Sequence, residues 1–557
     1  MAIELIQGID VLNTGRIKIN HVYSAQTNIW SSSTGVYSII SNNLPFSGGS
    51  TNVASGDYAF VVGLNNVASG NYGIVGGRAN VASGDSSVIS GGFYNKAYKA
   101  YSFVGAGESN NASGTSSFIG AGNSNRADGP YASVVAGNTN RVYSGVGTPY
   151  KGKSSSIIGG SGNKIHQSYS TISGGQNNII GKTALSYVNI RMFVGAGTAN
   201  KVYASQASVV GGSTNKVEEL ATNSFIGGGS LNTIGTVGYA TTNSVIGGGV
   251  VNFILGSSSS SFIGGGNSNT ITGLGPTYTN PPMYSAIVGG QSNVINYSSK
   301  QSFIGGGKSN NVKGYYGTIA GGRLNVIENS SNYSFIGGGY NNYGSAPFSV
   351  VGGGQLNIAN GSYSIITGGL SNYCAGVYTV VGGGKNNSIK SAARSGILGG
   401  QNNVVAFGHT DSFIIGSNLT SNTSNTTYME NLVVTGSVSK GSGSFRIPTP
   451  IPNEEGFLYH SFVESPTAGD NIYRWEIDVK DKSHIIELPD YFPHINENVQ
   501  IWISPSDGFG CGYGKIDTEE NRIIIATNED GTYNVLAIGT RNDEVAVKAW
   551  NGIKRND

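Results

Sequence analysis

Ser261-Phe-Ile-Gly-Gly-Gly-Asn-Ser-Asn-Thr-Ile-Thr-Gly273 is the stretch that decides the fold, because variants of it recur along most of the chain. The pair Phe262-Ile263 favours a short strand. The glycines at 264–266 allow backbone angles and close approaches that a Cβ would forbid. Asn269 suits a tight bend, because asparagine tolerates the left-handed conformation. A second short strand and a second corner follow at 270–273, which completes one flattened coil.

The pattern G-x-x-N, preceded by two or three apolar or small residues, recurs 21 times between Asn66 and Asn403, most often at a spacing of 15 residues. One such coil cannot bury its apolar pair alone, whereas stacked coils can. We therefore predict an all-β fold with a parallel β-solenoid over residues 46–405, about 100 Å long at about 4.8 Å per coil. Equivalent asparagines should stack as a ladder, each amide bonding the next. Representative ladder residues are Asn110, Asn125, Asn269, Asn310, Asn357 and Asn387.

Both residues of the apolar pair are large in many coils, as in Val134-Val135, Phe225-Ile226 and Val350-Val351. Adjacent residues of a strand face opposite sides. One of each pair should therefore face the coil interior and the other should face outward. A continuous outward row of this kind is too apolar to leave in water. Three identical chains around an axis would cover it, so we predict a homotrimer.

The repeat S-[VF]-[VI]-G-G-G-x-x-N-x-[IVA]-x-G resembles the left-handed β-roll head of trimeric autotransporter adhesins, and more closely its relatives in bacteriophage tail fibres. The resemblance covers residues 50 to 405 and implies a homotrimer that attaches to a surface glycan or protein of a host bacterium. The chain shows no signal-peptide pattern at its N-terminus and no run of about twenty apolar residues. We therefore expect a virion tail fibre made in the host cytoplasm, without membrane insertion, rather than a bacterial surface adhesin.

Three segments differ from the repeat. Residues 1–45 carry Ile19, Val22 and Tyr23 at helical spacing. By the same resemblance this segment docks to other phage tail or baseplate proteins, and the alternative is a helix that caps the first coil. Residues 406–443 are expected to be a connector. Residues 444–557 alternate β-forming residues with turn signals, which predicts a small antiparallel β-sandwich that binds a receptor or holds three chains in register.

The charge balance argues against nucleic acid as a partner. Residues 441–557 hold 19 acidic and 10 basic residues, a balance of −9, and the net charge of +2 leaves +11 for residues 1–440. Those positive charges are scattered singly along the sequence, with no interleaved aromatic ladder. The two cysteines, Cys374 and Cys511, are far apart, which excludes a disulfide framework.

Long spacings after some of the asparagines predict loops outside the coil. The loop after Asn140 would carry Tyr143 and Tyr150, and the loop after Asn269 would carry Tyr278 and Tyr284. An aromatic ring face can stack on a sugar, so these four tyrosines are candidate receptor contacts. The alternative is that the loops are tolerated surface insertions.

Catalysis is the competing hypothesis, as in a tailspike that cleaves polysaccharide. Asp57 and Asp85 fall in equivalent turns two coils apart, roughly 10 Å, within the range of glycosidase carboxylates. Both follow Ser-Gly at a corner, where aspartate is an ordinary turn former. Residues 147–154 match a P-loop spacing but contain Pro149 and precede a strand, and the histidines at 460, 484 and 494 match no metal-ligand spacing. We predict a non-enzymatic protein without cofactor or metal, and a passive decoration of a tail or capsid is a third hypothesis.

Overall fold

The computed structural model describes residues 9–12, 16–19, 46–144, 151–182, 190–273, 282–297, 299–436, 438, 444–448, 457–461 and 469–542. The chain divides into two compact units, Met1–Asn431 and Leu432–Asp557. No helix among the described residues is both long and apolar enough to cross a membrane.

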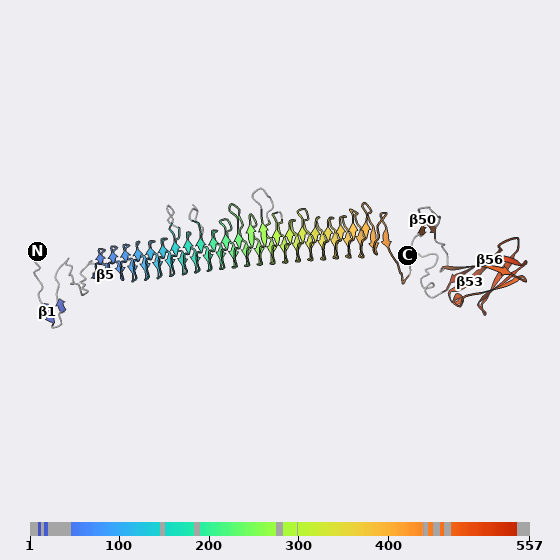
Figure 1. Cartoon of the computed structure of the whole chain (residues 1–557), viewed down its shortest axis with the longest axis horizontal. Helices are drawn as coiled ribbons and strands as arrows, with labels where there is room; N and C mark the ends of the chain where they lie inside the picture. Colours follow the sequence, from blue (N-terminus) through green and yellow to red (C-terminus); the bar gives the residue numbers. More distant parts are fainter. Residues whose placement is uncertain are drawn as a thin grey trace, which may run out of the picture. The chain divides into compact units, whose positions relative to one another are not determined.

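The first unit is a parallel β-solenoid, drawn in Figure 1 as a regular stack of short arrows. Its coils contribute strands alternately to two sheets. The first sheet runs from β3 (Phe46–Ser50) and β5 (Phe60–Leu64) through the odd-numbered strands to β47 (Phe413–Ile415) and β48 (Thr427–Met429). The second sheet runs from β4 (Val53–Ala54) through the even-numbered strands to β46 (Val404–Val405). Most strands in between are two residues long. The prediction of an all-β chain with a parallel β-solenoid is confirmed.

The coil quoted above shows how the sequence builds each turn. Strand β29 (Phe262–Ile263) pairs with β31 (Ala286–Ile287), and β30 (Thr270–Thr272) pairs with β32 (Val294–Ile295), in parallel and without a register shift. Ile263 is fully buried, and so is the inward residue of nearly all the remaining strands of the solenoid. Each coil therefore adds one apolar side chain from each sheet to a thin core that runs the length of the unit.

The three glycines of this coil are not equivalent, although the sequence predicted a close backbone approach for all of them. The third, Gly266, has a φ of +89°, and a Cβ there would lie 2.1 Å from the carbonyl oxygen of Gly290 in the next coil. Every coil in the series has glycine at this place. A Cβ on Gly265 would meet open space, and alanine occupies that place in other coils, for example Ala106 and Ala121. A Cβ on Gly264 would lie 2.3 Å from the carbonyl oxygen of Val288, yet valine occupies the equivalent place in other coils, for example Val135 and Val210. Only the third glycine is therefore kept in every coil.

The left-handed residue at this corner is also different from the one predicted. Ser268, not Asn269, has a positive φ, 57°. The same shift by one residue holds in the neighbouring coils, where Val251 and Ser292 precede the asparagine and have φ of 59° and 56°. The asparagine is selected for its hydrogen bonds rather than for its backbone angle.

The two ends of the solenoid unit depart from the sequence prediction. Strands β47 and β48 continue the first sheet into residues 406–443, which were expected to form a connector. Near the N-terminus, β1 (Ile9–Leu12) and β2 (Arg16–Ile19) form an antiparallel pair. Ile19 therefore ends a strand, and the predicted helix is wrong at that residue, because 16–19 pairs with 9–12 through backbone hydrogen bonds between strands. Val22 and Tyr23 lie outside the described residues.

The described residues of the second unit form antiparallel strands and one short helix. Strands β51 (Asp470–Val479), β56 (Gly531–Arg541) and β53 (Asn496–Pro505) form one three-stranded sheet. Strands β52 (Ser483–Glu487), β55 (Arg522–Thr527) and β54 (Gly512–Asp517) form another, β49 (Ser444–Pro448) pairs with β50 (Phe457–Ser461), and α1 spans Phe492–Ile495. Buried residues of both three-stranded sheets, such as Ile477 and Ile525, join in one core.

Candidate functional site

The predicted ladder asparagines lie fully buried at the corner between the two sheets. Asn269 is typical: its Oδ1 accepts the backbone N–H of Asn293 at 3.0 Å, and its Nδ2 donates to the carbonyls of Gly265 and Gly290 at 2.9 Å. The amides thus bind mainly to the backbone, and not simply one to the next as predicted. The same contacts are made by Asn110, Asn125, Asn269, Asn310, Asn357 and Asn387.

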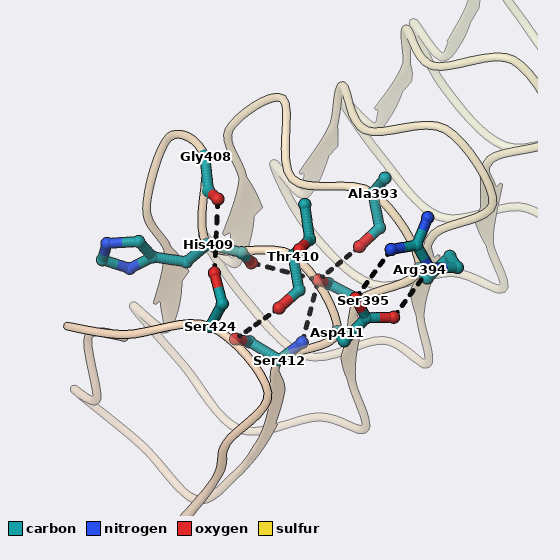
Figure 2. Close-up of polar contacts among 9 residues, drawn as sticks. All are labelled: Ala393, Arg394, Ser395, Gly408, His409, Thr410, Asp411, Ser412 and Ser424. Carbon is teal, nitrogen blue, oxygen red and sulfur yellow. Dashed lines mark hydrogen bonds and ion pairs between the residues drawn. The ribbon is translucent and has the colours of Figure 1, made fainter.

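A second buried polar column, which the sequence reasoning missed, consists of the serine that precedes many first-sheet strands. Figure 2 shows two of its members near the end of the solenoid. The Ser395 Oγ lies 3.0 Å from the carbonyl oxygen of Ala393 and accepts the N–H of Ser412 at 3.1 Å. The recurrent serine at the start of the repeat S-[VF]-[VI]-G could have predicted this column. Both buried columns serve the backbone, so recognition is expected on the outer surface instead.

The outward row of the first sheet keeps one large apolar side chain in most coils. Where the first outward residue is phenylalanine, the next outward residue is usually glycine, and the Phe262 ring lies 3.4 Å from the position of a Cβ on Gly264. Where the first is small, the next is usually aliphatic, as in Ser156 with Ile158. The rings at Phe118, Phe225, Phe262, Phe303 and Phe335 are 38–42% exposed, and the aliphatic replacements at Val135, Ile158, Val210, Val288 and Leu398 are 42–61% exposed.

This row refines the interpretation of the doubled apolar pair. In Phe225-Ile226 and Val350-Val351 the first residue faces outward and the second is buried. In Val134-Val135 the order is reversed, because Val134 is the buried residue and Val135 is 42% exposed. Period-2 alternation fixes the faces, but only the register of the stacked strands shows which member of a pair points inward.

The outward row of the second sheet is different in character. Over residues 96–216 it is rich in lysine and arginine, and from Thr233 to Val404 it is uncharged. Arg126 and Arg141 share Asp128, whose Oδ2 lies 3.0 Å from the Arg141 Nε. Lys216 pairs with Glu218. This basic stretch is the most strongly charged part of the described solenoid surface.

Of the four candidate receptor tyrosines, the structure describes two. Tyr143 does not project in a loop: it is half-buried on the second sheet, stacks on His166 at a centroid distance of 4.0 Å, and lies under Arg141 at 3.9 Å. Tyr284 also belongs to the coil, because it is a left-handed corner residue with φ of 58°, and it is 57% exposed. Tyr150 and Tyr278 lie outside the described residues.

Tyr284 belongs to a corner column that contains further aromatic residues. Five successive rings stack in parallel at centroid distances of 4.5–5.0 Å. They are Tyr316, Tyr333, Phe348, Tyr363 and Tyr378. Because each ring covers the face of the next, a sugar ring could stack only at the two ends of this run. The column therefore stabilises the corner more than it offers ring faces to a ligand.

His166 has the most perturbed titration on the second sheet. Burial, together with the positive charges of Lys164, Arg141 and Lys151, lowers the pKa of His166 to about 4. The imidazole is therefore neutral at physiological pH. Its position among three cations indicates a positive local potential on this face.

The residues considered for catalysis are engaged in corner hydrogen bonds. Asn71 lies in the turn between Asp57 and Asp85: its Oδ1 accepts the N–H of Asp57 at 2.9 Å and its N–H donates to Asp85 Oδ1 at 3.1 Å. His484 Nδ1 lies 3.0 Å from the carbonyl oxygen of Asp478. Within the described ranges, no three His, Cys, Asp or Glu side chains are grouped so that they could hold a metal. Residues 147–150 of the P-loop-like stretch and His460 have no described side chain.

A shallow hollow of about 270 Å³ lies in the second unit, beside α1 and β53. Asn496 lines it and donates from Nδ2 to the carbonyl of Phe492 and to the Tyr473 hydroxyl, at 2.9 and 3.0 Å. Asn521, also in the lining, donates to the carbonyls of Leu488 and Pro489. These amides hold the helix and the neighbouring turn in place.

In comparisons with known proteins, no family model matches the chain and no curated protein matches it.

Proposed function

We propose that this chain is the shaft of a homotrimeric virion fibre that attaches a bacteriophage to the surface of its host bacterium by multivalent, non-enzymatic binding. The observation that supports the proposal best is the first sheet's outward row, with its one large apolar side chain in most coils. A row of this length exposes more contiguous apolar surface than soluble monomers ordinarily leave in water.

Three copies around a common axis would bring three such rows together. Full burial of an exposed apolar side chain contributes roughly 1.5–3 kcal/mol, so these side chains, which are 38–61% exposed, would each contribute about half of that, coil after coil. The second sheet would then face solvent, with an outward row that is basic over residues 96–216 and that mixes half-buried apolar residues such as Val326 and Ile358 with Thr, Asn and Ser from Thr233 to Val404. The repeat's resemblance to phage tail fibres supplies the virion setting and the docking role of residues 1–45. Several weak sites per particle would raise the effective concentration without tight individual contacts.

Sedimentation of the full chain tests the assembly. We expect a mass three times that of the 57.5 kDa chain. Replacing Phe225 and Phe262 by lysine should release monomers, because it places charges in the covered row. The matched control, Thr233→Lys with Thr270→Lys, changes the outward residues of the second sheet in the same part of the solenoid and should leave the trimer intact. A monomeric wild-type chain would contradict the proposal.

Attachment is tested with the fluorescently labelled full chain on a panel of bacterial strains. We expect it to bind at least one strain without releasing reducing sugar from the surface polysaccharide. Binding to no strain would favour the passive decoration of a tail or capsid. Release of sugar would favour the tailspike hypothesis, and an Asp57→Asn, Asp85→Asn variant would then show whether these carboxylates carry the activity.

A further inference from the structure

The lysines and arginines that look scattered between residues 96 and 219 are gathered into one row by the stacking of the coils. Eight consecutive strands of the second sheet pair in register, and six of their eight outward residues are cationic. In order along the row they are Lys96, Asn111, Arg126, Arg141, Lys164, Ile179, Lys201 and Lys216. At about 4.8 Å per coil, this basic row is about 34 Å long.

The basic row carries a net positive charge after its ion pairs are counted. Residues 96–219 contain 11 Lys and Arg and 4 Asp and Glu, a balance of +7, whereas residues 1–95 contain 3 and 4, a balance of −1. Asp128 neutralises one of the two charges of Arg126 and Arg141. Lys216 pairs with Glu218. Among the described residues no carboxylate lies within ion-pair distance of the other three lysines of the row, Lys96, Lys164 and Lys201. One net positive charge therefore remains about every two coils, or about 10 Å.

Aromatic rings lie beside these cations on the same outer face. Tyr98, Tyr143 and Tyr203 each stand two residues after a cation of the row, and residues two apart in a strand share a face. The Arg141 guanidinium lies 3.9 Å from the Tyr143 ring centroid, and the Lys182 ammonium lies 4.8 Å from that of Tyr203. Tyr203 is buried, and the two faces of the Tyr143 ring are covered by Arg141 and His166. Tyr98 is 38% exposed, and the electron-rich face of such a ring attracts the C–H bonds of a sugar.

The low pKa of His166 is a separate sign of the same potential. His166 lies two residues after Lys164 on this face, and Lys164, Arg141 and Lys151 all disfavour its protonation in addition to the effect of burial. A field strong enough to oppose one more positive charge also attracts a negatively charged ligand.

We infer that the basic row binds an acidic polysaccharide, with carboxylate or phosphate groups on the cations and a sugar ring beside the exposed Tyr98. The spacing selects this class of polymer. Duplex DNA carries a charge about every 1.7 Å of its axis, far more densely than the row can match, whereas one charge per disaccharide repeats at about 10 Å, close to the interval of the row. The inference deepens the proposed attachment function, on which it rests for its biological setting.

The test uses the full chain and hyaluronan, which carries one carboxylate per disaccharide, with neutral dextran as the uncharged probe. Biolayer interferometry should show binding to hyaluronan that weakens as salt is added, and none to dextran. Replacing Lys164 and Lys201 by glutamate should weaken binding by about tenfold or more, because both lysines lack a carboxylate partner. The control Lys385→Glu with Lys390→Glu makes the same change in net charge away from the row and should alter binding less than about twofold.

Charge-reversal variants could lose binding because they misfold, so a variant that should gain binding is also tested. Thr233→Lys with Thr270→Lys extends the basic row into the uncharged stretch of the second sheet and should tighten binding to hyaluronan. The inference is overturned if hyaluronan does not bind, or if the row and control variants lose affinity equally. It is also overturned if soluble duplex DNA displaces the chain from immobilised hyaluronan at a lower concentration than soluble hyaluronan does. Sedimentation of the same samples separates the two proposals: a monomer that binds hyaluronan through the row would contradict the trimer only, and a trimer whose binding ignores the row would contradict this inference only.

Discussion

The two sheets of the solenoid bury nearly the same row of side chains and present different rows to the outside. Inside, both sheets place Val, Ile or Ala at almost every coil. Outside, the first sheet keeps one large apolar group in most coils, and the second sheet changes from basic over 96–216 to uncharged over 233–404. The repeat therefore constrains what faces the core and leaves the outward positions free for assembly and binding.

The largest effect should come from the inward row. Ile226→Ala removes three buried carbons from a thin core and should cost about 2–5 kcal/mol in the free energy of unfolding, measured by urea denaturation. The outward neighbour, Phe225→Ala, sharpens the comparison. If the first sheet is covered in the assembly, Phe225→Ala should also be clearly destabilising, and a loss of less than about 0.5 kcal/mol would indicate a row exposed to water.

The asparagine ladder should give the next largest effect. Asn269→Ala leaves the backbone N–H of Asn293 and the carbonyls of Gly265 and Gly290 without their side-chain partner inside the corner. Each buried group left unsatisfied costs about 1–3 kcal/mol. The matched control is Asn267→Ala, an exposed asparagine two residues away. Equal melting temperatures for the two variants would contradict the structural role given to the ladder.

The basic face of the second sheet should make stability depend on pH. The pKa of His166 is about 4 in the folded chain and near 6.5 when unfolded, so the unfolded chain binds the extra proton first as pH falls. The contribution is constant above pH 6.5, and stability is lost between pH 6.5 and 4. His166→Gln should reduce the change of melting temperature with pH in that window. An NMR titration of the wild-type imidazole should have its midpoint near pH 4. A midpoint near 6.5 would show that neither burial nor the neighbouring cations act on this imidazole.

The smallest effect should come from the ion pair at the last corners of the solenoid. Arg394 donates from Nε and Nη2 to the two carboxylate oxygens of Asp411, each at 2.7 Å (Figure 2). The Arg394 side chain is 60% exposed, and exposed pairs contribute little because water and salt screen them. Arg394→Ala should leave the melting temperature almost unchanged, and a shift as large as that of Asn269→Ala would mean that this corner is covered.

Some local predictions failed because several backbone conformations satisfy the same residue types. The spacing of Ile19, Val22 and Tyr23 fits a helix, yet Ile19 pairs with Ile9 in a strand, since the same β-branched and aromatic residues also favour an extended backbone. Asparagine favours left-handed angles, but here Ser268 adopts them and Asn269 turns its amide toward the backbone. The tyrosines were assigned to loops by spacing alone, and Tyr284 proved to be a corner of the coil.

The sequence by itself determined the period, the parallel stacking and the alternation of inward and outward residues. These follow from local rules, since a glycine at the tight approach and an apolar residue at every second position can build only one kind of coil. The tertiary structure alone decided which surface residues meet. Arg141 and Lys164 are 23 residues apart, with an insertion between them, and only the pairing of their strands makes them neighbours. Hydrogen bonds between coils set that register, so the residues that directly follow Asn140 and Asn163 in the sequence become neighbours in the stack.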